Sequence, residues 1–398
     1  MTQSRIIPAL TSEAALKRNL RSHLKSLGFR MGEGAGLIAS RSQKDDVRKL
    51  HIEQRRERIT TNSEFLRGNF SRLIEHFANG WDVDPTKIRF SLKQIHAGTI
   101  ESDLFRFASL SWSVPVSQGY GRRIRYLVLD EQNEKLAGII ALGDPVFNLR
   151  SRDNFICWSA KDRADRLVNM MDAYVLGAVP PYNMLLGGKA VACLVRSREV
   201  ASDFANKYGS REGIISKVQK KAQLVAVTTS SALGRSSVYN RLKLNGRVYF
   251  RPIGTSEGWG HFHIPDKIFS MMREYLRVRD HSYPDQHRFG SGPNWRMRTI
   301  RESLKSLGLS EALLRHGVQR EIFISCLAEN ALEILSQGHG EPNYGDLLTT
   351  TEISALAVNR WMEARARRRP EFRQWPRESF AQKISIELEG AVAAYAPL

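Results

Sequence analysis

Cysteine is scarce in this chain, and its distribution excludes a disulfide framework. Only three cysteines occur in 398 residues, and they form no closely spaced pair: Cys157, Cys193 and Cys326. An odd number of widely separated cysteines is not the pattern of a secreted, disulfide-stapled domain. Cys157 and Cys193 lie in apolar runs, where a free cysteine usually serves as a small core residue. We therefore predict a core role for both, and no catalytic cysteine.

Long apolar segments are also missing. No window approaches the roughly 18 consecutive apolar residues of a helix that spans a membrane. The first residues, MTQSRIIPALTSE, lack the apolar stretch and the cleavage site of a secretory signal. We expect a cytoplasmic protein with no membrane partner.

Two common catalytic signatures do not occur in the sequence. There is no phosphate-binding loop of the form GxxxxGK[ST], and no nucleophile motif of the form GxSxG. ATP hydrolysis by this chain is therefore not expected. The catalytic residues, if there are any, stay unassigned.

Histidines gather in two short segments. In GWGHFHIP, His261 and His263 are separated by one residue, a spacing that places both rings on one face of a strand. Asp266 would supply a third metal ligand. We favour the alternative, in which both histidines end a strand beside Trp259 and bind no metal. A second, loose group lies in a Pro- and Gly-containing loop: His281, Asp285 and His287. We predict no metal site, and a metal-dependent nuclease stays an alternative.

Acidic residues are outnumbered by basic ones. Sixty Lys and Arg against 41 Asp and Glu give a formal net charge of +19. Such a surplus attracts polyanions over a long range, and because no membrane anchor is seen, DNA is the expected partner. The apolar share of 42% and the charged share of 25% are ordinary for a globular protein, which excludes disorder of the whole chain.

Arginine and aromatic residues occur together in two segments. Arginine contacts phosphate through a fork of donors, and aromatic planes stack on exposed bases. We predict these nucleic-acid-binding residues: Arg122, Arg123 and Arg125, beside Tyr120, and Arg365, Arg367, Arg368, Arg369, Arg373, Trp375 and Arg377, after Trp361. The alternative is that cations at helix ends only complement the helix dipole. For Lys217, Lys220 and Lys221 the sequence favours neither nucleic-acid binding nor the helix-dipole role over the other.

Apolar spacing predicts helices at both ends of the chain. Leu16, Leu20 and Leu24 recur at helical intervals within 12–30. Further N-terminal helices are expected over 44–58 and 64–78. From about residue 265 the pattern is again mostly helical, with segments over 268–278, 295–307, 310–316, 320–335, 351–368 and from 379 onward.

The middle of the chain has the composition of β-strands. Apolar runs predict strands over 124–130, 136–143, 153–159, 172–179 and 222–229, with a last strand at RVYFRPI. A helix is expected over 189–208. We predict an α/β protein with three consecutive domains: a mainly helical region 1–115, a core 116–265 with a central mixed sheet, and a helical region 266–398.

The order of elements in this core resembles the GCN5-related N-acetyltransferase fold. A hairpin and further strands lead through Gly187 and Gly188 into a helix, followed by strand–helix–strand. The resemblance implies that SSVYNRLKL, residues 236–244, is the late helix of that fold. In that family the glycine-rich turn offers N–H groups to a pyrophosphate, so the resemblance implies cofactor contacts at Gly187, Gly188 and Lys189. The family's Gln or Arg at the start of this turn is replaced by Met184 or Leu185, and LAGIIALG offers no catalytic glutamate. We predict the fold without acetyl transfer, assign no cofactor, and keep glycine packing as the alternative.

A set of longer segments between Arg122 and Arg277 carries a second resemblance. The segments are RRIRYLVLD, LAGIIALGDP with Pro145, FICWSAKDR, AYVLGAVPPYN, FANKYG, LVAVTTSSALGRSSVYNRL and RPIGTSEGWGHFHIP. This set is similar to the core of the DruA-like family of the Druantia anti-phage system. The resemblance implies a bacterial defence role beside other defence proteins, among them a large helicase-like protein, and it implies no known reaction.

These observations together predict a defence-system component that binds nucleic acid, in particular phage DNA in single-stranded or distorted form. Two alternatives stay open. One is an enzyme, either a nucleotide- or acyl-CoA-binding transferase or a metal-dependent nuclease. The other is a non-catalytic scaffold whose basic faces meet acidic partner proteins.

Overall fold

The computed structural model describes residues 12–31, 37–38, 44–117, 119, 121–210, 222–279 and 293–385. The chain divides into two compact units, and each is built from two separate stretches of sequence. The small unit comes from 1–57 and 257–319, and the large unit from 58–256 and 320–398. The division into three consecutive domains stays a prediction.

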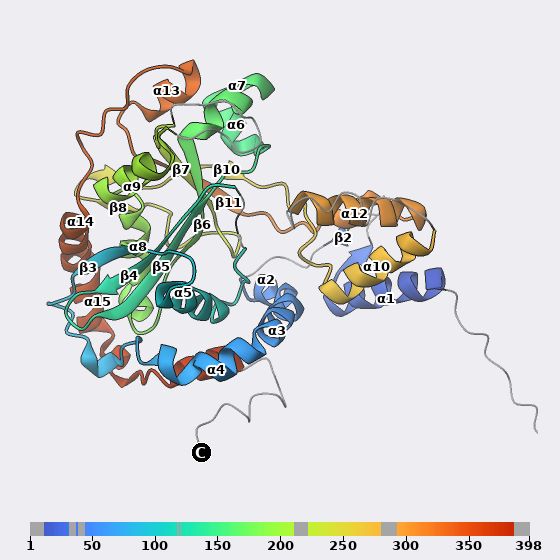
Figure 1. Cartoon of the computed structure of the whole chain (residues 1–398), viewed down its shortest axis with the longest axis horizontal. Coiled ribbons are helices and arrows are strands. Elements are labelled where there is room, and N and C mark those ends of the chain that lie inside the picture. Colours follow the sequence, from blue (N-terminus) through green and yellow to red (C-terminus); the bar gives the residue numbers. More distant parts are fainter. Residues whose placement is uncertain are drawn as a thin grey trace, which may run out of the picture. The chain divides into compact units, whose positions relative to one another are not determined.

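A seven-stranded mixed sheet forms the centre of the large unit (Figure 1). Its order is β10-β11-β7-β6-β5-β4-β3. The strands are β3 (Phe90–Gln94), β4 (Arg123–Asp130), β5 (Lys135–Gly143), β6 (Met170–Ala178), β7 (Ala226–Ser230), β10 (Arg251–Thr255) and β11 (Glu321–Cys326). β6 and β7 run parallel, and all other neighbours in this sheet are antiparallel. The predicted α/β class with a mixed sheet is confirmed.

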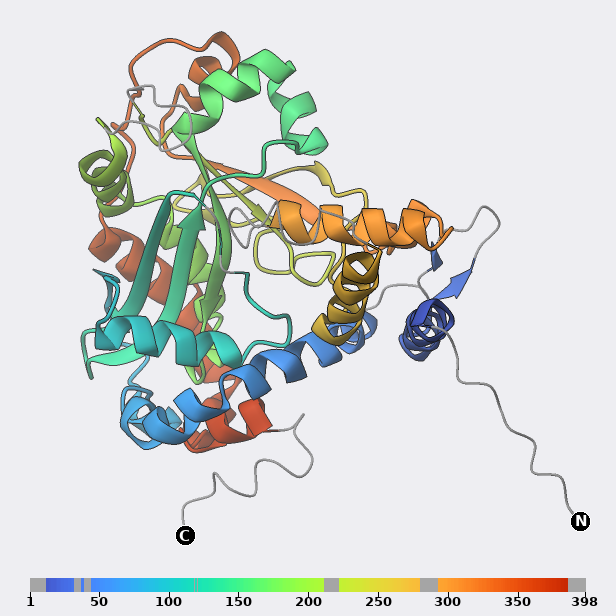
Figure 2. The ribbon, with the colours of Figure 1, turned by 45° about the vertical axis from the view of Figure 1, so that its right-hand side comes forward.

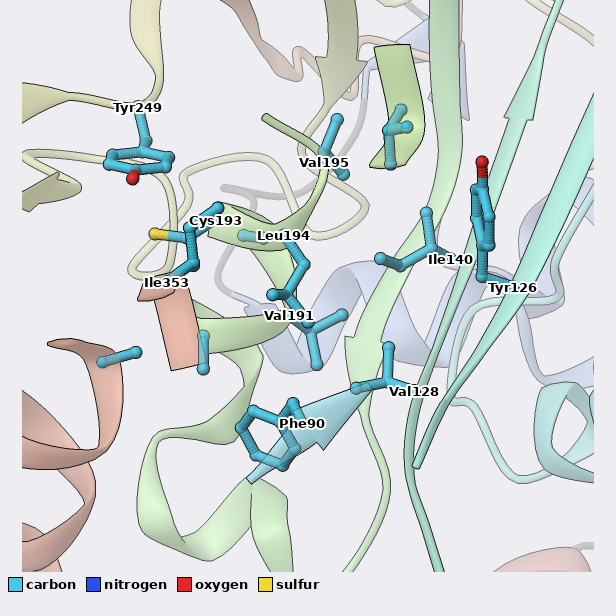
Figure 3. Packing of buried hydrophobic residues seen from close by; sticks show 14 of the residues in the cluster. Phe90, Tyr126, Val128, Ile140, Val191, Cys193, Leu194, Val195, Tyr249 and Ile353 are labelled. Carbon is cyan, nitrogen blue, oxygen red and sulfur yellow. The ribbon is translucent and has the colours of Figure 1, made fainter. Parts of the chain in front are cut away.

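Helices cover both faces of this sheet, because β4 and β5 are apolar on both sides. On β4, Tyr126 and Val128 point into one core and Leu127 into the other, as strand alternation requires. The first face is covered by α8 (Gly187–Leu194), α9 (Arg198–Tyr208) and α14 (Thr350–Ala357). Figure 3 shows this core, with Ile140 of β5 beside Val191 of α8.

The second face carries two apolar clusters. One lies under α4 (Ser63–Ile74), α5 (Ile100–Leu110) and α16 (Ser379–Ser385), where the rings of Phe77, Phe107 and Phe380 meet. The other lies under α6 (Arg150–Ile156) and α13 (Ala331–Gln337), with α7 (Ala160–Arg166) following α6. Figure 2 shows α5 and α14, coloured teal and orange-red, on opposite sides of the sheet.

The small unit is helical. Its helices are α1 (Ser12–Ser26), α2 (Lys44–Leu50), α10 (Asp266–Val278) and α12 (Pro293–Ser306), with the short pair β1 (Arg30–Met31) and β2 (Leu37–Ile38). Helix α3 (Ile52–Thr61) continues from this unit's residues into those of the large unit. Leu16, Leu20 and Leu24 are buried, and α1 packs against α10. The apolar repeat that predicted α1 is therefore its packing face.

Three predicted segments have a different structure. Residues 153–159 belong to α6 and the turn after it, because Trp158 packs below α13 and its indole donates to the carbonyl of Leu335 at 2.6 Å. The predicted helix over 236–244 is absent: the Ser236 hydroxyl accepts from the backbone of Val238 and Tyr239, and the short β8 (Lys243–Leu244) pairs with β9 (Arg247–Val248). The predicted helix over 320–335 is β11 followed by α13.

Smaller corrections concern single residues and breaks. The predicted helix over 189–208 is two helices, because Ser197 caps the start of α9 with its side chain. Cys193 is buried as predicted, whereas Cys157 is exposed, so its predicted core role is wrong. Among the helices of the described ranges, none combines the length and the apolar character needed to cross a membrane.

Candidate nucleic-acid interface

A long helical run near the C-terminus presents arginines to solvent. It passes without a break through α14, the π-helical turn η5 (Val358–Met362) and α15 (Glu363–Arg368). Thr349 caps its start through a reciprocal pair of bonds with Glu352, and Pro370 follows its end. Ile353, Ala357 and Met362 are buried in the core. The opposite side therefore exposes Arg360, Arg367 and Arg368.

The 3-10 helix η6 (Pro370–Gln374) is held against a second short helix, η1 (Gly80–Asp82). The Gly80 amide donates to the carbonyl of Trp375 at 2.7 Å. Only glycine fits there, since a Cβ on residue 80 would lie 1.8 Å from the carbonyl oxygen of Phe372. Phe372 is buried, so the neighbouring Arg373 faces solvent.

This contact brings Trp81 next to the arginine-rich segment. Trp81 is 57% exposed, which is unusual for an aromatic side chain of this size. Sequence reasoning missed Trp81, because almost 300 residues separate it from η6. The one local signal is its position after a glycine in the polar turn ANGWDVD.

Trp361 provides a second aromatic surface among cations. The ammonium of Lys189 lies 5.6 Å from its ring centre, and the guanidinium carbon of Arg360 lies 6.0 Å from it. Arg365 donates to the carbonyl of Met184, just before α8. The predicted residues Lys189 and Arg365, far apart in sequence, therefore lie around one stretch of helix.

We define the C-terminal basic group as these cations with two tryptophans: Lys189, Arg360, Arg365, Arg367, Arg368, Arg369, Arg373, Trp81 and Trp361. Two carboxylates form loose ion pairs with it. Glu363 lies 3.7 Å from Arg367, and Glu371 lies 3.7 Å from Arg369. Such exposed pairs neutralise little. Within the described chain, Arg360, Arg368 and Arg373 have no carboxylate partner.

Two other predicted residues near this group have internal partners. Arg377 bonds to Glu75 at 2.7 Å, and its amide donates to Asn79. Trp375 is half-buried, and its carbonyl accepts from Gly80. Both residues thus hold η1 against η6 and position Trp81.

The predicted cofactor residues lie at the start of α8. Gly187 is buried, and a Cβ there would lie 2.6 Å from the carbonyl oxygen of Tyr182. Gly188 has more room, with Val238 as its nearest neighbour at 4.0 Å. The glycine at 187 thus has a packing reason that needs no cofactor. Lys189 is engaged with Trp361.

The other predicted set consists of Arg122, Arg123 and Arg125, at the start of β4. This edge of the sheet holds the start of β6, whereas α8 follows the end of β6. Arg122 is half-buried and bonds to Asp144 at 2.7 Å and to the carbonyls of Val168 and Met170. Its donors are thus used inside the large unit. Arg123 is exposed, and Arg125 lies over the ring of Phe105 at 5.5 Å.

A carboxyl group with a perturbed pKa lies near this end of the sheet. Asp172 of β6 accepts from the hydroxyl of Thr228 at 2.7 Å. Burial raises its pKa to about 6, although Thr228 and the charge of Arg152 act in the opposite direction. A bulge follows at once, since the register of β5 and β6 shifts around Tyr174. Bulges and raised carboxyl pKa values are both common at functional sites.

Two histidines of the small unit, His261 and His263, belong to no metal-binding group among the described residues. His261 and His263 lie in a turn and not on a strand, which corrects the predicted placement. The ring of His263 is buried, with Nε2 2.9 Å from the carbonyl of Leu313. Burial lowers the pKa of both histidines to about 4. The described residues contain no group of three or more His, Cys, Asp and Glu that could hold a metal ion.

Some predicted residues lie outside the described residues. They are Tyr120, Lys217, Lys220, Lys221, His281, Asp285 and His287.

The comparison with known proteins decides the family. A family model described as Druantia protein DruA matches residues 41–337. The chain belongs to the DruA family. It is 54% identical over 373 residues to the Druantia protein DruA of Escherichia coli strain UMEA 4076-1. The aligned stretch covers 94% of this chain and 92% of that protein.

Membership of the DruA family confirms the family that the sequence predicted. No solved structure matches the chain. The DruA family match includes Trp81, Asp172 and Lys189, and it ends before the helical run that carries the C-terminal arginines.

Proposed function

We propose that this chain is a component of a bacterial Druantia anti-phage defence system and that it binds nucleic acid through the C-terminal basic group. The observation that carries the proposal is the contact between η1 and η6. It holds the segment with exposed Trp81 against η6, whose Arg373 is exposed and has no carboxylate partner among the described residues.

The chemistry of this group favours DNA with accessible bases. Arginine forks suit phosphate oxygens, and an exposed indole offers a plane on which a base can stack. Stacking of that kind is worth about 1–3 kcal/mol per base. Because paired bases inside a duplex cannot reach Trp81, single-stranded or distorted DNA is the preferred ligand. A helicase-like partner, which the family resemblance implies, would produce such DNA.

The experiment is a salt series of fluorescence anisotropy with labelled single- and double-stranded DNA. For single strands, log K falls with log salt by about 0.7 for each phosphate contacted. A variant R367Q/R368Q/R373Q should therefore flatten the slope by about 2. W81A should lower the single-strand affinity about 5- to 150-fold, the loss of about 1–3 kcal/mol, without changing the slope.

Matched controls exist on the same unit. R72Q/R89Q/R235Q removes three exposed arginines that lie outside the C-terminal basic group and have carboxylate neighbours, and it is the control for R367Q/R368Q/R373Q. F147A removes an exposed aromatic side chain and is the control for W81A. Equal slopes for the two arginine variants would contradict the proposal. No binding at low salt would favour the scaffold, in which the charge serves a protein partner. Magnesium-dependent cutting, absent with EDTA, would favour the nuclease.

We further propose that the core is acetyltransferase-like in fold. The support is its element order: the β4–β5 hairpin, antiparallel β6, the crossover through α8 and α9, and parallel β7. β6 and β7 pair only from Met170 to Asp172, so the strands part beyond that point. The turn residues do not fit a pyrophosphate site well, because Gly187 has a packing role and Lys189 contacts Trp361. Acetyl-CoA should therefore leave the Tm of the protein unchanged. A Tm that rises with acetyl-CoA concentration and then saturates would favour the alternative of an acyl-CoA-binding transferase.

A further inference from the structure

Helix α1 of the small unit has an exposed basic face that the C-terminal basic group does not include. Four cations and two small residues recur at helical spacing along it: Ala14, Lys17, Arg18, Arg21, Ser22 and Lys25. Intervals of three and four residues put all six on one side of the helix. The apolar side is turned inward, where α1 packs against α10. The basic face is therefore distinct from the leucine side that packs against α10.

Among the described residues, three of the four cations of this face have no acidic partner. Glu13 is the only acid in α1, and it pairs with Lys17 at 2.8 Å and with Arg279 at 2.6 Å. Arg18, Arg21 and Lys25 are exposed, and among the described residues no hydrogen bond or ion pair engages their side chains. Three other exposed arginines of the same unit are paired with carboxylates.

The contrast within the small unit is direct. Arg48 pairs with Asp45, Arg56 with Glu53, and Arg301 with Glu311. Helix α1 thus carries three exposed cations without a carboxylate partner on one face. In sequence, the small unit has 22 Lys and Arg against 13 Asp and Glu, which is +9 of the chain's +19 in less than a third of its residues.

The face is also hollowed. The same six residues line an open groove of about 500 Å³. Ala14 and Ser22 are short, so a ligand can approach the helix backbone between the long cationic side chains. Among the described residues no aromatic side chain lines the groove, so the described lining offers no platform on which a base could stack. This lining suits a polyanion that binds through its charge.

Double-stranded DNA has the matching dimensions. Lys17 to Lys25 spans about 12 Å of helix axis at about 1.5 Å per residue. Duplex DNA carries one negative charge per roughly 1.7 Å, and its major groove, about 12 Å wide, admits an α-helix. We infer that α1 is a second DNA-binding surface, which contacts the phosphate backbone of duplex DNA independently of the C-terminal basic group.

The test compares two triple variants of equal charge change on the same unit. R18Q/R21Q/K25Q removes the unpaired cations of α1, and R48Q/R56Q/R301Q removes three paired ones. Duplex binding is measured as log K against log salt. Each lost phosphate contact flattens the slope by about 0.9, so the α1 variant should lose about 2.7 relative to the control. Equal slopes for the two variants would overturn the inference.

Further variants distinguish a loss of charge from a loss of folding, and binding by α1 from binding by the C-terminal basic group. R18K/R21K/K25R keeps the charge and should retain the slope, while far-ultraviolet circular dichroism checks that each variant is folded. R367Q/R368Q/R373Q should reduce single-strand binding and leave the contribution of α1 to duplex binding intact. If the α1 variant loses no duplex affinity but fails to co-purify with another defence protein, the face serves an acidic protein and the inference is wrong.

Discussion

Asp172 offers the sharpest test of the energetics of the sheet. Its carboxylate accepts from Thr228, yet burial raises its pKa to about 6. An unfolded aspartate ionises near 3.9. Because the folded value is raised, the folded state holds the proton over a range where the unfolded chain has lost it. The stability that this proton contributes is fully present below about pH 3.9 and is lost as the pH rises through about 6.

The magnitude follows from the difference between the two pKa values. One pKa unit corresponds to about 1.36 kcal/mol, so two units make ionised Asp172 cost the folded state at most about 3 kcal/mol at pH 8. Asn at this position still accepts from the Thr228 hydroxyl and cannot ionise. D172N should therefore gain stability over the wild type as the pH rises from 4 to 7, and level off above.

The assay is urea unfolding of both proteins at pH 4.5, 6 and 8. Asp162 provides a control of opposite sign, since its bonds to Ser159 lower its pKa. Its contribution is present at high pH and lost on acidification, so D162N should lose stability at pH 8. A D172N difference that does not change between pH 4.5 and 8 would refute the reasoning about Asp172.

The other predictions concern glycine packing and thiol reactivity. G80A should destabilise the protein by about 1–3 kcal/mol in urea unfolding, because the added Cβ meets the Phe372 carbonyl. G68A, in helix α4 with no atom within 4 Å of the added Cβ, should stabilise by about 0.5–1 kcal/mol; the same sign for both would contradict the close approach at Gly80. A thiol reagent should modify exposed Cys157 in the native protein and spare Cys193, whose thiol pKa is raised by burial. Equal labelling rates would show that Cys193 is accessible.

Local patterns predicted the elements that depend on near neighbours. The β4–β5 hairpin follows from two apolar runs separated by a short polar turn, and α1 from the interval between its leucines. Strand β11 was predicted as helix because its partners are distant: Phe323 pairs with Thr229 and with Pro252. A sequence pattern contains no information on such pairing.

The candidate site shows the same limit. Composition identified the arginines of α15 and η6, which are adjacent in sequence. It missed Trp81, and it included Arg122, whose donors are taken by Asp144 and backbone carbonyls. Charge alone cannot distinguish an arginine that faces solvent from one that closes an internal network. That distinction is made by tertiary contacts between residues far apart in the chain.

The discontinuous small unit has a consequence for protein synthesis. Leu16, Leu20 and Leu24 leave the ribosome about 250 residues before α10, against which α1 packs. At about 5–20 residues per second, the apolar side of α1 waits roughly 12–50 s for its partner. During that interval the leucines of α1 stay without their native partner, so α1 is the segment of the nascent chain on which a chaperone for apolar helices is expected to act.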